Sequence, residues 1–277
     1  MIVSCFVLAC LAQAPSSEDL VKQATAAWAK NESARAFELV SRAIDVDPKN
    51  SQALRIRAAF HEAKGAFPDG IRDWTSVLKL DSTETEAYHA RGCLHFKAGQ
   101  VAESLADFDV YLQKRPERRK EHWQRGISCY YAGRFGEGRR QFEVYQDFDD
   151  ADVENAVWRF MCMVRSDGLA KAQGGMLKIG DDRRVPMRDI YELYRGKKTP
   201  DDVLAAAVRG DLEPALKSRQ LFYAHLYLGI WFDLLGDRVK ALDHLNKAAN
   251  DYRIDHYMGD VARVHRDLLA NAKAEKR

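Results

Sequence analysis

Residues 85–116 read TEAYHARGCLHFKAGQVAESLADFDVYLQKRP, and this stretch decides the fold. Small and apolar side chains recur in it at every third or fourth position, in two runs separated by Ala98-Gly99-Gln100. Such spacing is typical of two amphipathic helices joined by a tight turn. The stretch therefore predicts a helical hairpin.

The same pattern returns along the chain with a period of 34 residues. Arg91-Gly92 falls on Arg125-Gly126 in the next copy, and the turn residue Gly99 falls on Gly133. Further matches at this period are Phe96 with Tyr130, Phe108 with Phe142, Tyr111 with Tyr145, and, towards the N-terminus, Gly99 with Gly65 and Gly65 with Asn31. A fixed period of this length indicates a helical repeat array, so we predict an all-α solenoid.

The recurring residues resemble the tetratricopeptide repeat (TPR). Five residues stand where that motif has its characteristic side chains: Gly92, Ser104, Phe108, Tyr111 and Pro116. Each suits its place, because glycine lets paired helices cross closely and proline starts a helix but does not continue one. The resemblance implies a TPR-type solenoid whose first helices line a concave, protein-binding face.

The repeats predict the following order of parts. Four TPR-like helix pairs occupy residues 17–152, a helical insert without the repeat occupies 153–221, and one further helix pair occupies 222–254. Residues 255–277 are expected to form a capping helix and tail, since a stacked array needs a half-polar helix over its open end. Residues 1–16 are expected to be a signal segment.

The first 17 residues contain no charged side chain. Their apolar run, residues 2–12, is too short to span a bilayer and ends at Ala12-Gln13-Ala14, which is similar to a signal-peptidase site. Cys10 stands where a lipobox would place an acylated cysteine. We expect an exported, periplasmic or envelope-associated protein. The alternative is a frayed, buried N-terminal segment or a wrongly assigned start codon, which would make the protein cytoplasmic.

Composition and motifs exclude several classes of function. The formal net charge of +2 over 277 residues gives no electrostatic basis for binding nucleic acid. We find no HExxH, GxSxG, Walker A or GxGxxG motif and no metal-ligand spacing of histidines, so we predict no enzyme, no cofactor and no metal. Cys93, Cys129 and Cys162 are interpreted as small buried hydrophobes.

Positions on the first helices that face outward recur with the same period. Aromatic residues beside cations in these rows suit peptide binding, because Trp and Tyr supply large contact area at little entropic cost. The predicted partner-binding residues of the concave face are Arg55, His89, Lys97, Trp123 and Tyr131. For Phe96 and Tyr130 we favour packing into the next repeat, whereas for Trp123 and Tyr131 packing and partner binding are equally supported.

Two alternatives use the insert. An enzyme or small-ligand module would have its site in residues 166–194, where Gly174-Gly175 with Arg183 and Arg184 could approach an anion. A glycine pair is more often a turn, and we favour that interpretation. A structural subunit that self-associates through the insert is the other alternative.

The order of parts, with three stretches of sequence, is similar to the NlpI-type TPR lipoproteins of the bacterial envelope. The stretches are AVWRFMCM (156–163), MRDIYELYRGKKTPDDVLAAA (187–207) and YLGIWFDLLGDRVKALDHLNKAA (227–249). This resemblance implies an exported, non-enzymatic adaptor, often a homodimer, that recruits envelope proteases and cell-wall hydrolases. Membrane contact would come only through an N-terminal lipid anchor, although the chain lacks a clear lipobox.

Overall fold

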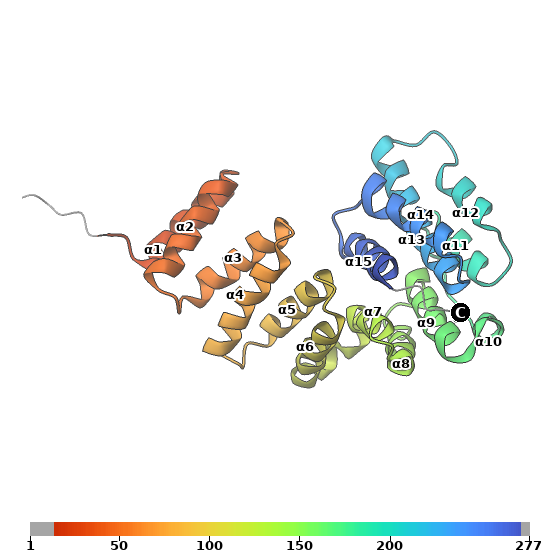
Figure 1. Cartoon of the computed structure of the whole chain (residues 1–277), viewed down its shortest axis with the longest axis horizontal. Helices are drawn as coiled ribbons and strands as arrows, with labels where there is room; N and C mark the ends of the chain where they lie inside the picture. The colour runs from red at the N-terminus through yellow and green to blue at the C-terminus, as the bar shows by residue number, and fades with distance from the viewer. Residues whose placement is uncertain (1–13, 273–277) are drawn as a thin grey trace, which may run out of the picture. The chain divides into compact units, whose positions relative to one another are not determined.

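The computed structural model describes residues 14–272, and within this range the chain forms helices joined by turns, with no strand (Figure 1). The prediction of an all-α fold is confirmed. The chain divides into two compact units, Met1–Glu84 (unit 1) and Thr85–Arg277 (unit 2), which we describe separately. Most of the predicted signal segment, residues 1–13, and residues 273–277 lie outside the described part of the chain.

Unit 1 consists of two helix pairs. The helices are α1 (Ser17–Ala29), α2 (Ser33–Val46), α3 (Ser51–Ala63) and α4 (Phe67–Leu80). Side chains that satisfy free backbone N–H groups cap both first helices: Ser16 Oγ accepts a hydrogen bond from the Asp19 backbone, and Asn50 Oδ1 accepts one from the Ala53 backbone at 3.0 Å. Two residues beyond the end of each first helix stands a residue with positive φ, Asn31 at 62° and Gly65 at 71°.

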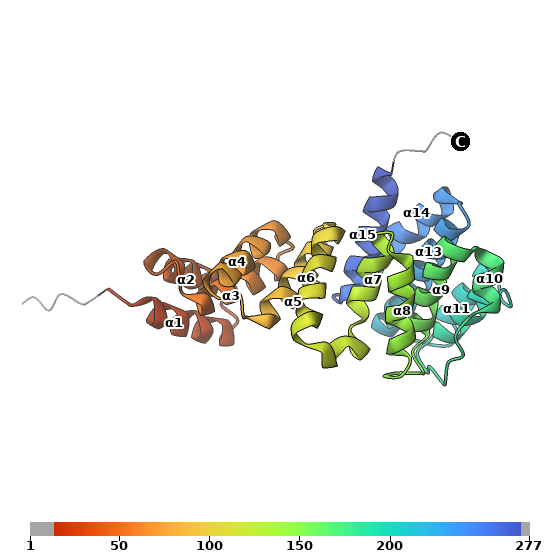
Figure 2. The ribbon, with the colours of Figure 1, turned by 90° about the horizontal axis from the view of Figure 1, so that it is seen from below.

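Unit 2 holds the remaining helices (Figures 1 and 2). They are α5 (Thr85–Lys97), α6 (Val101–Lys114), α7 (Trp123–Tyr131), α8 (Phe135–Tyr145), α9 (Val153–Asp167), α10 (Leu169–Gly174), α11 (Met187–Tyr194), α12 (Pro200–Ala207), α13 (Pro214–Leu234), α14 (Arg238–Asn246) and α15 (Tyr257–Asn271). A 3-10 turn, Pro116–Glu121, precedes α7, and a π-helical turn, Lys247–Asp251, follows α14. Helices α5 with α6, α7 with α8, and α13 with α14 pack as pairs.

The turns between paired helices lie seven residues after the glycines of the helix crossings, as the repeat pattern predicts. Gly99, Gly133 and Gly236 have φ values of 76°, 73° and 78°, in the left-handed region that glycine enters without a steric penalty. At the first of these turns, the Gln100 backbone N–H donates to the His95 carbonyl at 2.8 Å, which satisfies a carbonyl left open at the helix end. The sequence signal for these turns is therefore a local backbone requirement.

A small residue on the first helix faces a large one on the second in each pair of unit 2 that follows the repeat. A Cβ atom on Gly92 would lie 2.8 Å from Phe108 Cε1, and one on Gly126 would lie 2.6 Å from Phe142 Cζ. Gly229 has the same relation to Leu245 Cγ, at 2.6 Å. No side chain fits in these spaces, so the glycines set how closely the paired helices approach.

Helix α9 continues the stack beyond the fourth pair. It packs on α8, and its Arg159 stands 34 residues after Arg125. Arg125 Nε donates to Asp109 at 2.6 Å, and Arg159 Nη2 donates to Glu143 at 2.8 Å, so each arginine contacts a carboxylate on the preceding second helix. The arginine period thus extends into the stretch that the repeat template assigned to the insert.

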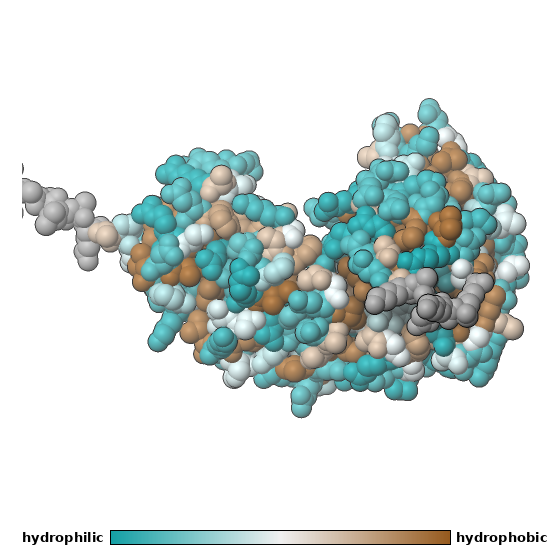
Figure 3. Space-filling model, viewed as in Figure 1, coloured by the Kyte–Doolittle hydropathy of each residue, from teal (hydrophilic) through white to brown (hydrophobic). Residues whose placement is uncertain are grey.

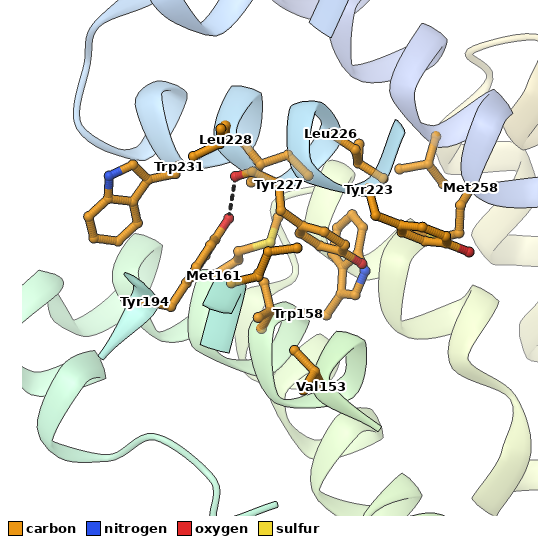
Figure 4. Close-up of a cluster of buried hydrophobic side chains, with 14 of the residues drawn as sticks. Val153, Trp158, Met161, Tyr194, Tyr223, Leu226, Tyr227, Leu228, Trp231 and Met258 are labelled. Carbon is orange, nitrogen blue, oxygen red and sulfur yellow. Dashed lines mark hydrogen bonds between the residues drawn. The ribbon is translucent and has the colours of Figure 1, made fainter. Parts of the chain in front are cut away.

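A hydrophobic core of unit 2 lies where α9, α11 and α13 meet (Figure 4). Trp158 on α9, Tyr194 on α11 and Tyr227 on α13 are buried there. The Tyr194 hydroxyl donates to the Tyr227 carbonyl at 2.8 Å, and burial holds the pKa of Tyr194 well above its ordinary value. The insert is therefore part of the same hydrophobic core as the returning helix pair.

We predict that Gly126→Ala lowers the free energy of unfolding by about 1–3 kcal/mol, because the new methyl group would meet the Phe142 ring at the helix crossing. The matched control is Gly136→Ala on α8, where the nearest atom, Arg140 Nη1, would be 3.7 Å away. That substitution should leave stability unchanged or raise it by up to about 1 kcal/mol. Urea unfolding followed by circular dichroism measures both, and equal midpoints for the two variants would contradict the packing argument.

Candidate functional site

The C-terminal helix α15 lies against α5 and α7, the first helices of the third and fourth repeats (Figure 2). Lys97 Nζ is 3.2 Å from Asp260 Oδ2, and the Tyr131 hydroxyl is 2.9 Å from His265 Nδ1. Trp123 meets Tyr257 edge to face, with ring centroids 5.1 Å apart. Three of the five predicted partner-binding residues are therefore brought together, and α15 covers them.

The other two predicted residues lie elsewhere. His89 packs in a cluster of rings with Phe108, Tyr111 and His122, at centroid distances of 5.0 to 5.7 Å. Arg55, in unit 1, donates from Nη2 to Glu84 Oε1 at 2.5 Å. The role of all five residues in partner binding remains a prediction.

Phe96 and Tyr130 are buried, as the packing interpretation expects. Phe96 stacks on Tyr257 of α15 with centroids 5.2 Å apart, and Tyr130 meets Trp158 of α9 at 5.7 Å. Burial raises the pKa of Tyr130 to about 12. These two rings join the repeats to the elements that follow them.

Beside this covered face, unit 2 contains a cavity of about 510 Å³, which we call the Arg184 cavity. Helices α7, α8 and α9, the segments around residues 150 and 182, and the start of α15 enclose it. Its lining residues are Trp123, Ile127, Phe142, Tyr145, Asp149, Ala151, Asp152, Glu154, Asn155, Trp158, Asp181, Asp182, Arg183, Arg184, His256 and Met258. Trp123 is the predicted site residue that reaches it.

Three carboxylates surround the guanidinium group of Arg184. Its Nη2 atom is 2.6 Å from both Asp152 Oδ1 and Asp182 Oδ2, and Nη1 is 2.8 Å from Glu154 Oε2. The Tyr227 hydroxyl donates to the other oxygen of Glu154 at 2.6 Å. An anion at Arg184 would meet these negative charges, so this geometry disfavours the anion site considered for Arg183 and Arg184.

Burial and hydrogen bonding shift the pKa values of the carboxyl groups around Arg184. Desolvation raises the pKa of Asp152, and desolvation with the nearby Asp152 charge raises that of Glu154. The hydrogen bonds from Arg184 instead lower the pKa of Asp182, against its own desolvation. The guanidinium group thus stabilises a concentration of negative charge that its surroundings alone would oppose.

Polar atoms without hydrogen-bond partners occur on the α9 side of the cavity. Asn155 is 3% exposed and Trp158 is 2% exposed, yet Asn155 Oδ1 and Trp158 Nε1 have no partner among the described residues. Asp152 accepts its hydrogen bonds through Oδ1. Neither Asp152 nor Asn155 was among the predicted site residues, although their spacing of three at a helix start indicates a shared face.

Unit 1 has a groove of its own on its first helices. It has a volume of about 430 Å³ and is lined by Ala24, Thr25, Trp28, Ile56, Ala59, Phe60 and Ala63 of α1 and α3; we call it the α1–α3 groove. Trp28 is 54% exposed there and meets Phe60 edge to face at 5.1 Å. The face of the molecule drawn in Figure 3 is largely hydrophilic, with scattered apolar patches.

Two features are absent from residues 14–272. No group of three or more His, Cys, Asp or Glu side chains is placed to hold a metal ion. No helix in that range combines the length and the apolar character that crossing a bilayer requires.

Comparison with known proteins identifies the fold. No family model matches the sequence, and no curated protein does. Among solved structures, a tetratricopeptide repeat protein from Parabacteroides merdae is similar at a TM-score of 0.58 and 14% identity, covering 92% of this chain and 99% of that one. The C-terminal part of a TPR repeat-containing protein from Cytophaga hutchinsonii matches at a TM-score of 0.51 and 15% identity, covering 87% of this chain and 99% of that one. MamA matches at a TM-score of 0.51 and 14% identity, covering 72% of this chain and 98% of that one.

At these identities the similarity shows the fold alone, and that fold is a TPR-type helical solenoid. The resemblance to TPR proteins predicted from the repeated residues is confirmed. The narrower resemblance to NlpI-type lipoproteins stays a prediction.

We predict that Arg184→Met lowers the free energy of unfolding by about 1–3 kcal/mol at pH 7, because it leaves three carboxylates without their cation. This loss of stability is smaller than the loss expected on removing one partner of a fully buried ion pair, since the Arg184 side chain is 42% exposed. Arg183→Met is the control, because Arg183 is 91% exposed and pairs with an exposed Asp181.

The deficit of Arg184→Met should shrink on acidification. The pKa of Glu154 is already raised in the folded protein, and losing the cation raises it further. A carboxyl group with a raised folded pKa favours folding below its unfolded value, about 4.3, and this contribution is lost as pH rises through the folded pKa. Urea unfolding at pH 7 and pH 5 checks this, and a deficit that grows at pH 5 would contradict it.

Proposed function

We propose that this chain is a non-enzymatic scaffold that binds segments of other proteins on the inner faces of its first helices. The TPR-type fold supports a repeated surface for docking, because each first helix presents the same positions to that face. The observation that carries the proposal is the α1–α3 groove, an apolar surface with a half-exposed tryptophan in unit 1. Exposed apolar surface of this kind marks interaction sites.

The period relates this groove to the face that α15 occupies in unit 2. Trp28 lies two periods before Phe96, and Ala63 lies one period before Lys97. Phe96 and Lys97 both contact α15, through a stacked ring and an ion pair. Equivalent positions therefore hold a helix of the chain itself in unit 2, which supports a helical segment of a partner as the occupant of the groove in unit 1.

The mode of α15 binding indicates how a partner segment would be held. Tyr257 contacts both Phe96 and Trp123, and the polar contacts of Asp260 and His265 lie one and two turns further along the same helix. An aromatic anchor followed by polar contacts at helical spacing is a recurrent form of helix recognition.

Localisation in the bacterial envelope belongs to the proposal. One support is the uncharged leader with Ala12-Gln13-Ala14. The other is the similarity in the order of parts to NlpI-type lipoproteins, which are adaptors that recruit proteases and cell-wall hydrolases. Under this proposal the partners are envelope proteins. A mature chain that begins at Cys10 would contact the membrane through a lipid on that residue, and one that begins at Pro15 would not.

We predict that Ala59→Glu strongly lowers partner recovery through the α1–α3 groove. Ala59 lines the groove and is exposed, so a carboxylate there should spare the fold while placing a charge against any apolar segment. An unpaired charge at an apolar contact should lower recovery at least about tenfold. Quantitative mass spectrometry of proteins cross-linked to the tagged protein in cells measures this.

Ala26→Glu on α1 is the matched control, because Ala26 is exposed on the neighbouring helix and does not line the groove. It should recover the wild-type set of partners, with circular dichroism confirming equal helicity for both variants. Recovery of the same set, in the same amounts, with Ala59→Glu would exclude the groove as the docking surface.

Export has its own test. We expect the mature protein in the periplasmic or membrane fraction, with an N-terminus at Pro15 after cleavage or at a lipidated Cys10. Cell fractionation with N-terminal sequencing and mass measurement decides between these. A cytoplasmic protein that retains residues 1–14 would reject the envelope proposal and leave the scaffold proposal in place.

A further inference from the structure

The Arg184 cavity has more acidic than basic groups in its lining. Five carboxylic acids face it, against the two guanidinium groups of Arg183 and Arg184. Its histidine, His256, adds no charge at neutral pH, since burial lowers its pKa below the ordinary value. The cavity therefore favours a cationic ligand over an anionic one.

The start of α9 supplies polar atoms for such a ligand. Asp152, Asn155 and Trp158 follow one another at intervals of three and line the cavity together. Asn155 Oδ1 is a buried acceptor without a partner, and Asp152 Oδ2 receives none of the hydrogen bonds that the described residues make to this carboxylate. An ammonium group has three N–H donors, so it could satisfy both oxygens.

Aromatic side chains also line the cavity. They are Trp123 of α7 and Phe142 and Tyr145 of α8. Aromatic faces attract an organic cation and pack against its alkyl stem. A lining that combines carboxylates with aromatic rings fits an alkylammonium better than a hydrated metal ion, which prefers a shell of oxygen ligands.

Trp158 distinguishes a peptide from a free amine. Its Nε1 is a buried donor without a partner, and it needs an acceptor that an alkylammonium lacks. Asp152 and Trp158 are six residues apart, which is about 9 Å along the helix axis. A ligand that carries an ammonium at one end and a carbonyl at the other matches this separation.

We propose that the Arg184 cavity binds a lysine side chain of a partner polypeptide, with the ammonium between Asp152 and Asn155 and a peptide carbonyl accepting from Trp158. The choice of a polypeptide as the source rests on the proposed scaffold function; the choice of an ammonium rests on the cavity. Trp123 then takes part in partner binding from the cavity side, while its contact with Tyr257 holds it in place.

Titration of the full chain with acetyl-Gly-Lys-Gly-amide tests the proposal, with butylammonium and acetyl-Gly-Glu-Gly-amide as further probes. The five tryptophans give five indole N–H signals in a proton–nitrogen correlation spectrum, of which two belong to cavity residues, Trp123 and Trp158. We expect the lysine peptide to shift these two signals saturably and to leave those of Trp28, Trp74 and Trp231 in place. The glutamate peptide should shift none.

Asp152→Asn is the variant, because asparagine keeps the helix-capping acceptor and removes the charge. It should weaken the lysine peptide at least tenfold, whereas Asp150→Asn, at an exposed residue that does not line the cavity, should change the affinity less than twofold. Unchanged signals of the other tryptophans verify that each variant is folded.

Each result decides a separate point. No saturable shift with the lysine peptide, or equal affinity in Asp152→Asn, overturns the ammonium site. Butylammonium binding as tightly as the peptide overturns the peptide as source, because the carbonyl then contributes nothing. Both outcomes leave the scaffold proposal intact, since that proposal is tested through Ala59 in unit 1.

Discussion

The close crossing of paired helices depends on one contact, between a residue without a side chain on the first helix and a bulky side chain on the second. At Gly126 a single methyl group would already lie 2.6 Å from the Phe142 ring. Because protein interiors are packed as densely as crystals, such a contact sets the distance between helix axes. The same relation holds at Gly92 and Gly229, so it fixes the geometry of pairs on both sides of the insert.

This regular packing leaves the first helices with a second face that the pairs do not bury among themselves. In unit 2, α15 covers part of that face with Tyr257, Asp260 and His265. His265 lies 3.4 Å from Asp233 of α13, so α15 joins the returning helix pair to the earlier repeats. Covering the face here limits where a partner can bind, and it leaves the α1–α3 groove of unit 1 as the apolar surface on equivalent positions.

Local requirements explain what the sequence predicted. A left-handed turn needs glycine or asparagine, and a close helix crossing needs glycine. The turn at Gly99 and the crossing at Gly92 can therefore be predicted from the local sequence alone. The position of α15 depends on contacts such as that between Lys97 and Asp260, which join residues far apart in sequence and carry no periodic signal. The period identified Trp123 and Tyr131 as outward-facing residues. It could not predict that α15 covers them, because the contacts of α15 are not periodic.

The Arg184 cavity shows a further limit of periodic reasoning. Its carboxylates come from the turn before α9, the first turn of α9 and the segment around residue 182, and Arg184 brings three of them together. Arg184 has two opposite effects on the charge of the cavity. It neutralises part of the negative charge, and it holds Asp152, Glu154 and Asp182 close together, so that the remaining negative charge is concentrated there. Without this arginine, the bound cation alone would have to hold the carboxylates together against their mutual repulsion. The guanidinium group therefore preorganises the acidic wall, which lowers the free-energy cost of binding a second, smaller cation beside it.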